Sequence, residues 1–190
     1  MRTPNRRFSG KDTRTRINHA IRAPELRVIG PEGENIGTLS LADALKEAEK
    51  VMKKWADRLD RHQKNSIVSK INNSGEKGVK VSSEMIYLLK RINHYSVLTD
   101  GAIDPTIAPL IDLWGFGTSN PEVPDKKTIE KKLQFVDYTK LDLDEKNKEV
   151  ILPPEMKIDL GAFAKGFIID KAYDYRSEER RVGKECTLRC

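Results

Sequence analysis

The spacing of apolar residues predicts the first elements of the chain. Apolar and polar residues alternate over 25–29 and again over 35–39, which predicts a hairpin of two short strands joined by a turn at 30–33. From residue 41 to 59 the apolar positions recur every three to four residues, the spacing of an amphipathic helix. Ser40 stands where the N-cap of that helix is expected. The first 60 residues therefore predict a small β-hairpin followed by a helix.

Beyond residue 60, helical and strand patterns alternate over shorter lengths. One predicted helix has an apolar side made of Met85, Leu88, Leu89, Ile92 and Tyr95. The other predicted elements are a Pro105-led helix ending near Leu113 with Asp104 at its N-cap, a helix at 128–133, a hairpin of strands at 140–143 and 149–152, a strand at 156–160 and a helix at 163–175. Helices mixed with short antiparallel hairpins indicate the α+β fold class.

The positive charge of the chain is concentrated at its two ends. The net charge is +6, but residues 1–24 hold seven Lys or Arg against one Asp, and residues 176–190 hold five against three Glu. The part between them is mildly acidic, so the basic pI says nothing about its partners. We expect 1–16 to be a disordered basic arm, because it contains almost nothing to bury.

The last residues differ from the rest in composition. Both cysteines, Cys186 and Cys190, lie there, which leaves the preceding chain without a thiol for a disulfide, an iron–sulfur cluster or a zinc site. Residues 176–186 resemble the in-frame translation of a sequencing-library adapter, so we expect 176–190 to be an artefactual tail; a genuine charged helix is the alternative. The basic N-terminus is followed by no apolar run, so the sequence predicts no signal peptide, no transmembrane segment and a cytoplasmic location.

Two loops carry residue types suited to binding a nucleotide. The predicted strand at 156–160 runs into Gly161, and small residues at a strand-to-helix turn let a ligand approach the backbone. Lys165 adds a positive charge in the first helical turn, and Asp159 can accept hydrogen bonds from a base or organise a hydrated Mg²⁺. A capped core helix with a surface lysine explains the same residues.

The second loop lies upstream, at 100–106. Asp104 either caps the Pro105-led helix or faces a ligand. Further along, Trp114 and Phe116 are separated by a glycine, and they form either a mobile aromatic flap that lies on a planar ring or a plug for the core.

Together these segments resemble a known family. Residues 100–117 and 159–166, with 65–72 upstream in the same order, strongly resemble the FAD:protein FMN transferase family, the ApbE-type flavin transferases, over about 51–175. The resemblance implies Mg²⁺-dependent transfer of FMN from FAD onto a threonine of an acceptor flavoprotein, with release of AMP. It implies contacts to FAD from Ala102, Ile103, Asp104, Asp159 and Lys165. His62 stands where members of the family often carry Tyr or Phe near the cofactor. The resemblance also implies that the main chain of Ala162 is a ligand of Mg²⁺.

The resemblance covers part of such a domain. The family's distal half, which carries a glycine-rich GGD-type loop and the Asp and Thr that complete the metal site, has no counterpart in this sequence, so no catalytic side chain is assigned. We expect 51–175 to be the N-terminal half of the domain and the chain to be inactive alone. Members of the family are commonly exported or membrane-anchored, unlike the cytoplasmic location that this sequence predicts.

A different resemblance marks the first quarter. Residues 16–45 are similar to the start of bacterial translation initiation factor 3, and the similarity stops near Glu49, which predicts a partial domain of that kind at 17–50. The chain is then a fusion, either a mis-assembly or a genuine two-domain protein. The alternative function is binding to the small ribosomal subunit or to RNA through basic residues such as Arg16, Arg22 and Arg27.

Overall fold

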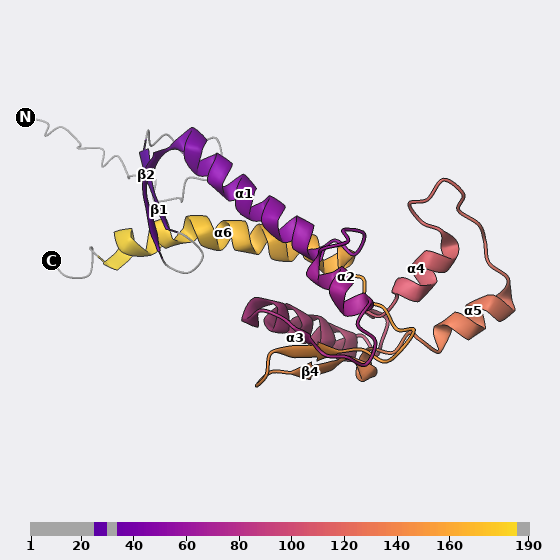
Figure 1. Cartoon of the computed structure of the whole chain (residues 1–190). Helices are drawn as coiled ribbons and strands as arrows, with labels where there is room; N and C mark the ends of the chain where they lie inside the picture. The colour runs from indigo at the N-terminus through magenta and orange to yellow at the C-terminus, as the bar shows by residue number, and fades with distance from the viewer. Residues whose placement is uncertain (1–24, 30–33, 186–190) are drawn as a thin grey trace, which may run out of the picture.

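The molecule is built along two long helices that lie side by side (Figure 1). The computed structural model describes residues 25–29 and 34–185, and for 26, 29 and 174–185 it describes the backbone alone. The long helices are α1 (Leu41–Leu59) and α6 (Gly161–Glu185). At one end of the pair, β1 (Glu25–Ile29) and β2 (Asn35–Ser40) form a two-stranded antiparallel sheet that contacts both helices.

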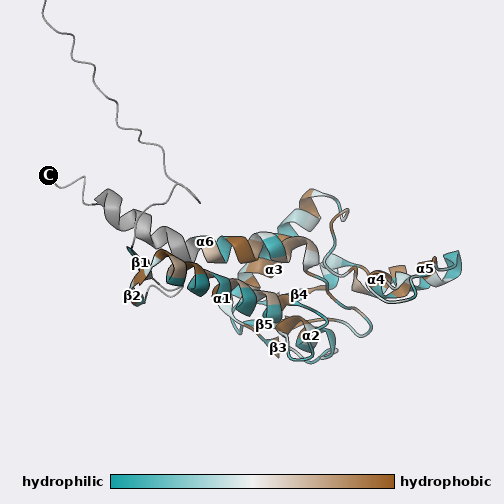
Figure 2. Cartoon of the chain, turned by 90° about the horizontal axis from the view of Figure 1, so that it is seen from above, coloured by the Kyte–Doolittle hydropathy of each residue, from teal (hydrophilic) through white to brown (hydrophobic). Residues whose placement is uncertain are grey.

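The other end of the pair meets a second group of short elements. These are α2 (Ile67–Asn72), β3 (Val79–Lys80), α3 (Ser83–Leu98), α4 (Ala108–Trp114), α5 (Lys126–Leu133), a 3-10 turn at Tyr138–Lys140, β4 (Asp142–Asp144) and β5 (Glu149–Ile151). The three strands form an antiparallel sheet in the order β3-β5-β4. In both Figure 1 and Figure 2, α4 and α5 stand out at the far end as a projection. This mixture of helices and small antiparallel sheets confirms the α+β class.

The start of α1 follows directly from its sequence. Ser40 has an extended backbone, and its hydroxyl accepts a hydrogen bond from the Asp43 amide at 3.2 Å, the N-cap arrangement that the pattern predicts. The buried face of α1 is narrower than the predicted apolar face. Ala44, Ala48, Trp55 and Leu59 are buried, whereas Leu45 and Met52 are exposed on neighbouring positions.

One apolar core joins the second group of elements to the long helices. Its fully buried side chains come from α2, α3, β5 and the segment before α6, and include Ile71, Met85, Leu89, Ile92, Val150 and Ile158. The long helices join this core where the rings of Trp55 and Phe167 meet edge to face, with centroids 5.0 Å apart. In Figure 2, hydrophilic residues follow the outer side of α1, and hydrophobic ones lie in the middle stretch of α6.

Several predicted elements differ from the observed ones. The helix expected from Pro105 to about Leu113 is present as α4, but it begins three residues later than predicted, at Ala108. The strand at 156–160 is wrong, because a single bridge from Lys157 to Ile107 is all that forms there. The last helix begins two residues before its predicted start and continues to Glu185, and α5 also begins two residues early. The short helix α2 was not predicted. Tyr95 was placed on the core side of α3, yet it is 40% exposed.

Some predictions fall outside the described residues. These are the disordered arm at 1–16, the turn at 30–33 and the two cysteines. The boundary at residue 50 stays a prediction, although α1 runs through it without a break, and the backbone of α6 likewise continues past residue 176. Within the described ranges, none of the helices is both long enough and apolar enough to cross a membrane.

The core predicts a contrast between two leucines of α3. Leu89 is fully buried and Leu98 is 64% exposed, so Leu89→Ala should lower the free energy of unfolding by about 2–5 kcal/mol, through lost burial and a residual cavity. Leu98→Ala on the same helix should change it by less than about 0.5 kcal/mol. Urea denaturation followed by circular dichroism measures both, and equal losses would contradict this core.

Candidate functional site

The two loops singled out in the sequence lie side by side in the structure. The Asp159 amide donates to the Pro105 carbonyl at 2.8 Å, and Ile107 forms a parallel bridge with Lys157. On its other side, the segment before α6 is fixed by Asn72, whose side-chain amide donates to the Ile158 carbonyl at 2.9 Å and accepts from the Ile158 N–H at 2.7 Å. These bonds hold Asp159 at the start of α6.

The carboxylate of Asp159 has a different partner on each oxygen. Its Oδ1 accepts the Gly161 N–H at 2.8 Å, which caps the start of α6. A Cβ at residue 161 would stand 3.0 Å from that Oδ1, so glycine allows the carboxylate to fold back this closely. The Oδ2 lies 2.6 Å from Arg61 Nε, but off the N–H axis, so this contact is an ion pair rather than a well-directed hydrogen bond.

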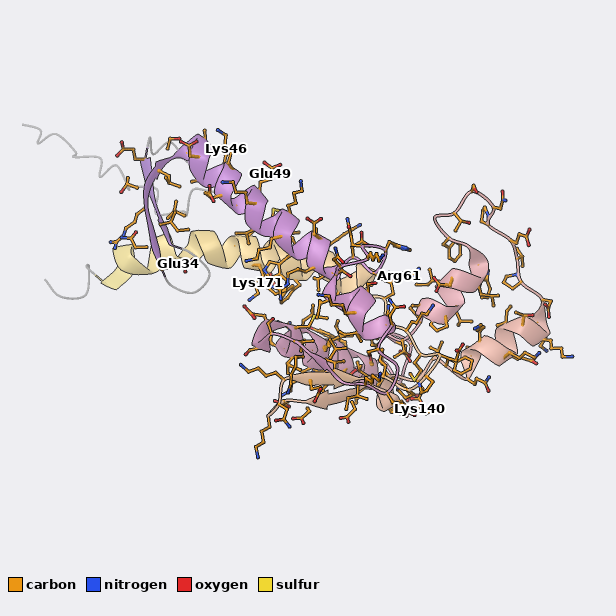
Figure 3. The ribbon with its side chains drawn as sticks, in the orientation of Figure 1. Glu34, Lys46, Glu49, Arg61, Lys140 and Lys171 are labelled. Atoms are coloured by element: carbon orange, nitrogen blue, oxygen red, sulfur yellow. The ribbon has the colours of Figure 1, made fainter. Side chains whose placement is uncertain are left out.

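Arg61 also reaches α4. Its Nη1 donates to Asp112 Oδ1 at 2.6 Å, and the other oxygen of Asp112 lies 3.8 Å from Lys157 Nζ. The Arg61 side chain is only 10% exposed, so its charge depends on these two carboxylates. One guanidinium therefore joins the end of α1, the projection and the start of α6; Figure 3 shows Arg61 at this junction.

A hollow of about 280 Å³ opens beside this junction. It is lined by the end of α1, the residues after it and the first two turns of α6, including Leu59, Arg61, His62, Asp159, Gly161 and Lys165. The start of an α-helix carries partial positive charge and unpaired N–H groups. The carboxylates of Asp60 and Asp159 also line the hollow and Arg61 is paired with Asp159, so Lys165 is the positive charge that an anion would meet at this end.

The structure brings some of the predicted site residues together and separates others. His62, Asp159 and Lys165 line the hollow, and Ala162 lies in the first turn of α6 beside it. Ala102 and Ile103 are exposed on the neighbouring loop but do not line the hollow. Their contacts to FAD stay predictions.

Asp104 is engaged within the chain. Its Oδ1 accepts from both the amide and the hydroxyl of Thr106, at 2.7 and 2.6 Å, and its Oδ2 accepts the Tyr138 amide at 3.0 Å. The Thr106 hydroxyl in turn accepts the Asp137 amide at 2.8 Å. The expected N-cap role of Asp104 is wrong for this reason, since its carboxylate organises the loop ahead of α4 instead of capping a helix.

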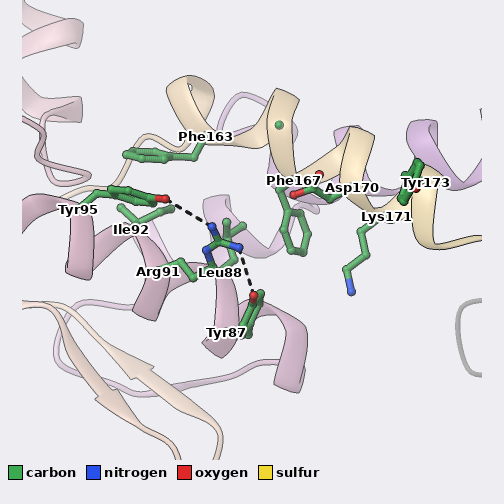
Figure 4. Close-up of a pocket in the computed structure, with 11 residues that line it drawn as sticks. Tyr87, Leu88, Arg91, Ile92, Tyr95, Phe163, Phe167, Asp170, Lys171 and Tyr173 are labelled. Atoms are coloured by element: carbon green, nitrogen blue, oxygen red, sulfur yellow. Dashed lines mark hydrogen bonds between the residues drawn. The ribbon is translucent and has the colours of Figure 1, made fainter. Parts of the chain in front are cut away.

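A larger groove of about 400 Å³ lies between α3 and α6 (Figure 4). Arg91 lies in it, with Nη1 and Nη2 directed at the hydroxyls of Tyr87 and Tyr95 at 3.2 and 3.4 Å. Phe163 and Phe167 of α6 form the opposite wall. This groove contains none of the residues that the resemblance assigns to FAD, so the smaller hollow is the better candidate site.

Among the described residues, no ready-made cluster of metal-ligating side chains is present, and a Mg²⁺ contact from Ala162 stays a prediction. Mg²⁺ takes six oxygen ligands in a near-octahedral arrangement. Asp159 already pairs with Arg61 and caps α6, and the carbonyl of Ala162 points along the helix toward its C-terminal end. Within the part of the chain that the structure describes, three or more His, Cys, Asp or Glu nowhere gather as metal ligands would.

Arg61 is the central residue that the sequence did not reveal. Its partners Asp112 and Asp159 lie 51 and 98 positions away along the chain, so its local sequence contains no sign of the pairing. Arginine just after a helix is usually solvent-exposed. Its burial becomes visible only when the two loops are brought together.

Comparisons with known proteins identify the family of the chain. The profile of the ApbE family matches residues 14–182, and the chain therefore belongs to the ApbE family. It is 33% identical over 132 residues to the FAD:protein FMN transferase of Klebsiella pneumoniae (strain 342) and 26% identical over 134 residues to that of Vibrio cholerae, covering 68% of this chain and 42% and 39% of those proteins.

Solved structures show the same fold. The ApbE protein of Thermotoga maritima superimposes with a TM-score of 0.70 at 30% identity, covering 81% of this chain and 52% of that one. The flavin transferase ApbE from Vibrio cholerae gives 0.68 at 26% identity, covering 77% and 48%. The chain thus spans about two fifths to one half of the length of the relatives that it matches.

A short segment of the chain also matches a protein of another family. Translation initiation factor IF-3 of Mycobacterium tuberculosis is 53% identical over 36 residues, which cover 19% of this chain and 18% of that protein. A match of this length supports the resemblance of the first quarter. It is too short to assign the function of an initiation factor.

The bonds of Asp104 predict a structural role that stability can measure. Asp104→Asn keeps the shape of the side chain but replaces one acceptor oxygen by an amide donor, which then faces either Thr106 or Tyr138. We expect the free energy of unfolding to fall by about 1–3 kcal/mol. The matched change Asp142→Asn, at an exposed strand position, should leave it within about 0.5 kcal/mol. Unchanged stability of the Asp104 variant in urea denaturation would show that the carboxylate is free for a ligand.

Proposed function

We propose that this chain supplies one wall of the FAD site of an FAD:protein FMN transferase, with the pyrophosphate of FAD at the start of α6. The observation that carries the proposal is the placement of Asp159, fixed by Arg61 and by its bond to the Gly161 N–H, in the lining of a hollow that also includes His62 and Lys165. The relatives named FAD:protein FMN transferase support the assignment.

The first turn of α6 suits a pyrophosphate. The Gly161 amide is used by Asp159, and the amides of Phe163 and Ala164 both donate to the Leu160 carbonyl. Ala162 lies between them in the same turn, and we expect its N–H to donate to a phosphate oxygen. The helix dipole and the Lys165 ammonium add positive charge at the same place.

The proposed reaction of the whole protein is a phosphoryl transfer onto an acceptor flavoprotein. The hydroxyl oxygen of a target threonine forms a bond to the flavin-side phosphorus of FAD, the pyrophosphate bridge breaks, and AMP leaves with the bridging oxygen while the hydroxyl proton passes to solvent. The part of this chain in the reaction is to bind and orient the pyrophosphate. Mg²⁺ dependence belongs to the proposal for the whole protein, since the described residues contain no ready-made cluster of metal-ligating side chains.

Lys165 and Lys171 offer a matched test of where FAD binds. Lys165 lines the hollow, whereas Lys171 lies further along α6 over the rings of Trp55 and Phe167. Lys165→Gln should raise the Kd for FAD by about tenfold, because a charge-assisted contact to phosphate is lost. Lys171→Gln should change the Kd by less than about twofold. A titration that follows quenching of flavin fluorescence measures both, and equal weakening, or binding too weak to detect in the unsubstituted chain, would overturn the proposal.

The chain alone is predicted to be inactive. Incubation of the purified 190-residue chain with FAD, Mg²⁺ and a flavoprotein acceptor domain should give no covalent flavin on the acceptor, because the chain spans only about two fifths to one half of its relatives and few ligands are at hand among the described residues to hold the Mg²⁺ that stabilises charge on the pyrophosphate. In-gel flavin fluorescence after denaturation detects the product, and a full-length relative serves as the positive control. A fluorescent acceptor band with this chain would contradict the prediction.

A further inference from the structure

Asp112 belongs to α4 and does not line the hollow, yet it binds the residue that fixes the hollow's central carboxylate. Its Oδ1 accepts from Arg61 Nη1 at 2.6 Å, and the same guanidinium pairs through Nε with Asp159 at 2.6 Å. Arg61 thus stands between two carboxylates that come from separate elements. Its planar group cannot turn toward one of them without changing its contact to the other.

We propose that Asp112 is a positioning residue that acts through Arg61 on Asp159, so that ligand binding in the hollow is coupled to the placement of the α4–α5 projection. The proposal rests on the proposed function only for the identity of the ligand, a flavin nucleotide. The coupling itself rests on the ion-pair chain of Asp112, Arg61 and Asp159.

The proposed coupling would affect the end of α4 and the loop that follows it. Residue 112 lies in the last turn of α4, where its carbonyl accepts the Gly115 amide at 3.1 Å, and Gly115 ends the helix with a left-handed φ of 64°. The loop that follows contains Phe116, which is 61% exposed. A shift of Arg61 toward Asp159 therefore removes one of the two cations at the Asp112 carboxylate, beside this aromatic loop, and leaves Lys157 Nζ 3.8 Å from its other oxygen. Because such coupling is reciprocal, a contact that fixes the α4–α5 projection also favours the position that Asp159 takes when the ligand is bound.

Two electrostatic effects of Asp112 have opposite signs and can be separated. Loss of the negative charge of Asp112 directly favours the binding of an anionic ligand nearby. Loss of its contact to Arg61 leaves Arg61 and Asp159 less well positioned, which weakens binding. The direct effect is small, because Asp112 is 41% exposed and screened by solvent. It also persists when Arg61 is replaced, so a double-mutant cycle cancels it and leaves the coupling.

The test is that cycle, measured as the Kd for FAD by flavin fluorescence. Asp112→Asn should weaken binding about fivefold, within the range for charged residues that share a partner. In an Arg61→Met background the same change should have no weakening effect. The control Asp57→Asn removes an exposed carboxylate from the last turns of α1 and should leave the Kd within about twofold in both backgrounds. Equal effects of Asp112→Asn in both backgrounds would overturn the proposal.

A second measurement decides the matter if Arg61→Met does not fold or if FAD does not bind. The Gly161 N–H donates to Asp159 Oδ1 at 2.8 Å, so its amide resonance in a ¹⁵N-labelled chain reports the placement of that carboxylate. Asp112→Asn should shift this resonance, as should Arg61→Lys, while Asp57→Asn should not. A Gly161 resonance that stays unchanged in Asp112→Asn would refute the coupling, whereas a shift without FAD binding would refute only the proposed function.

Discussion

One buried guanidinium sets the arrangement on which the candidate site depends. Arg61 is 10% exposed and holds two carboxylates, one from α4 and one from the residue that caps α6. A charge placed this far from solvent is stable only with its partners in position. The end of α1, the start of α6 and the projection therefore all meet at one side chain, in addition to the packing of Trp55 against Phe167. The hollow is the space that this arrangement leaves beside the helix start.

The backbone around Arg61 shows why this part of the fold is precise. Asn72 satisfies both polar groups of Ile158, and the Asp159 amide is satisfied by Pro105, so the segment before α6 is held without being part of a regular sheet. Asp104 does the same for the upstream loop by accepting three hydrogen bonds. Irregular segments that are partly buried against a core need such partners for their polar groups, because burial removes much of their contact with water. Two loops that are distant in sequence thereby become one surface.

The sequence predicted those features that depend on local spacing. The helices α1 and α3, the Ser40 cap and the two hairpins follow from periodicity and capping residues, and the structure confirms them. The prediction from sequence failed where hydrogen bonds between distant residues replaced local ones. The Pro105 carbonyl accepts from the Asp159 amide, and Pro105 does not lead a helix. The segment 156–160 is fixed by the Asn72 side chain and not by a neighbouring strand. The resemblance picked out both loops and their family, but neither periodicity nor resemblance could find Arg61, whose partners are distant in sequence.

The most direct test of the whole account is the location of FAD on the chain. Chemical-shift changes on adding FAD to the ¹⁵N-labelled protein report it residue by residue. The account predicts that the largest changes fall at residues 60–62 and 159–165, around the hollow and the start of α6. Changes concentrated at Tyr87, Arg91 and Tyr95, in the larger groove between α3 and α6, would contradict it, as would the absence of any change.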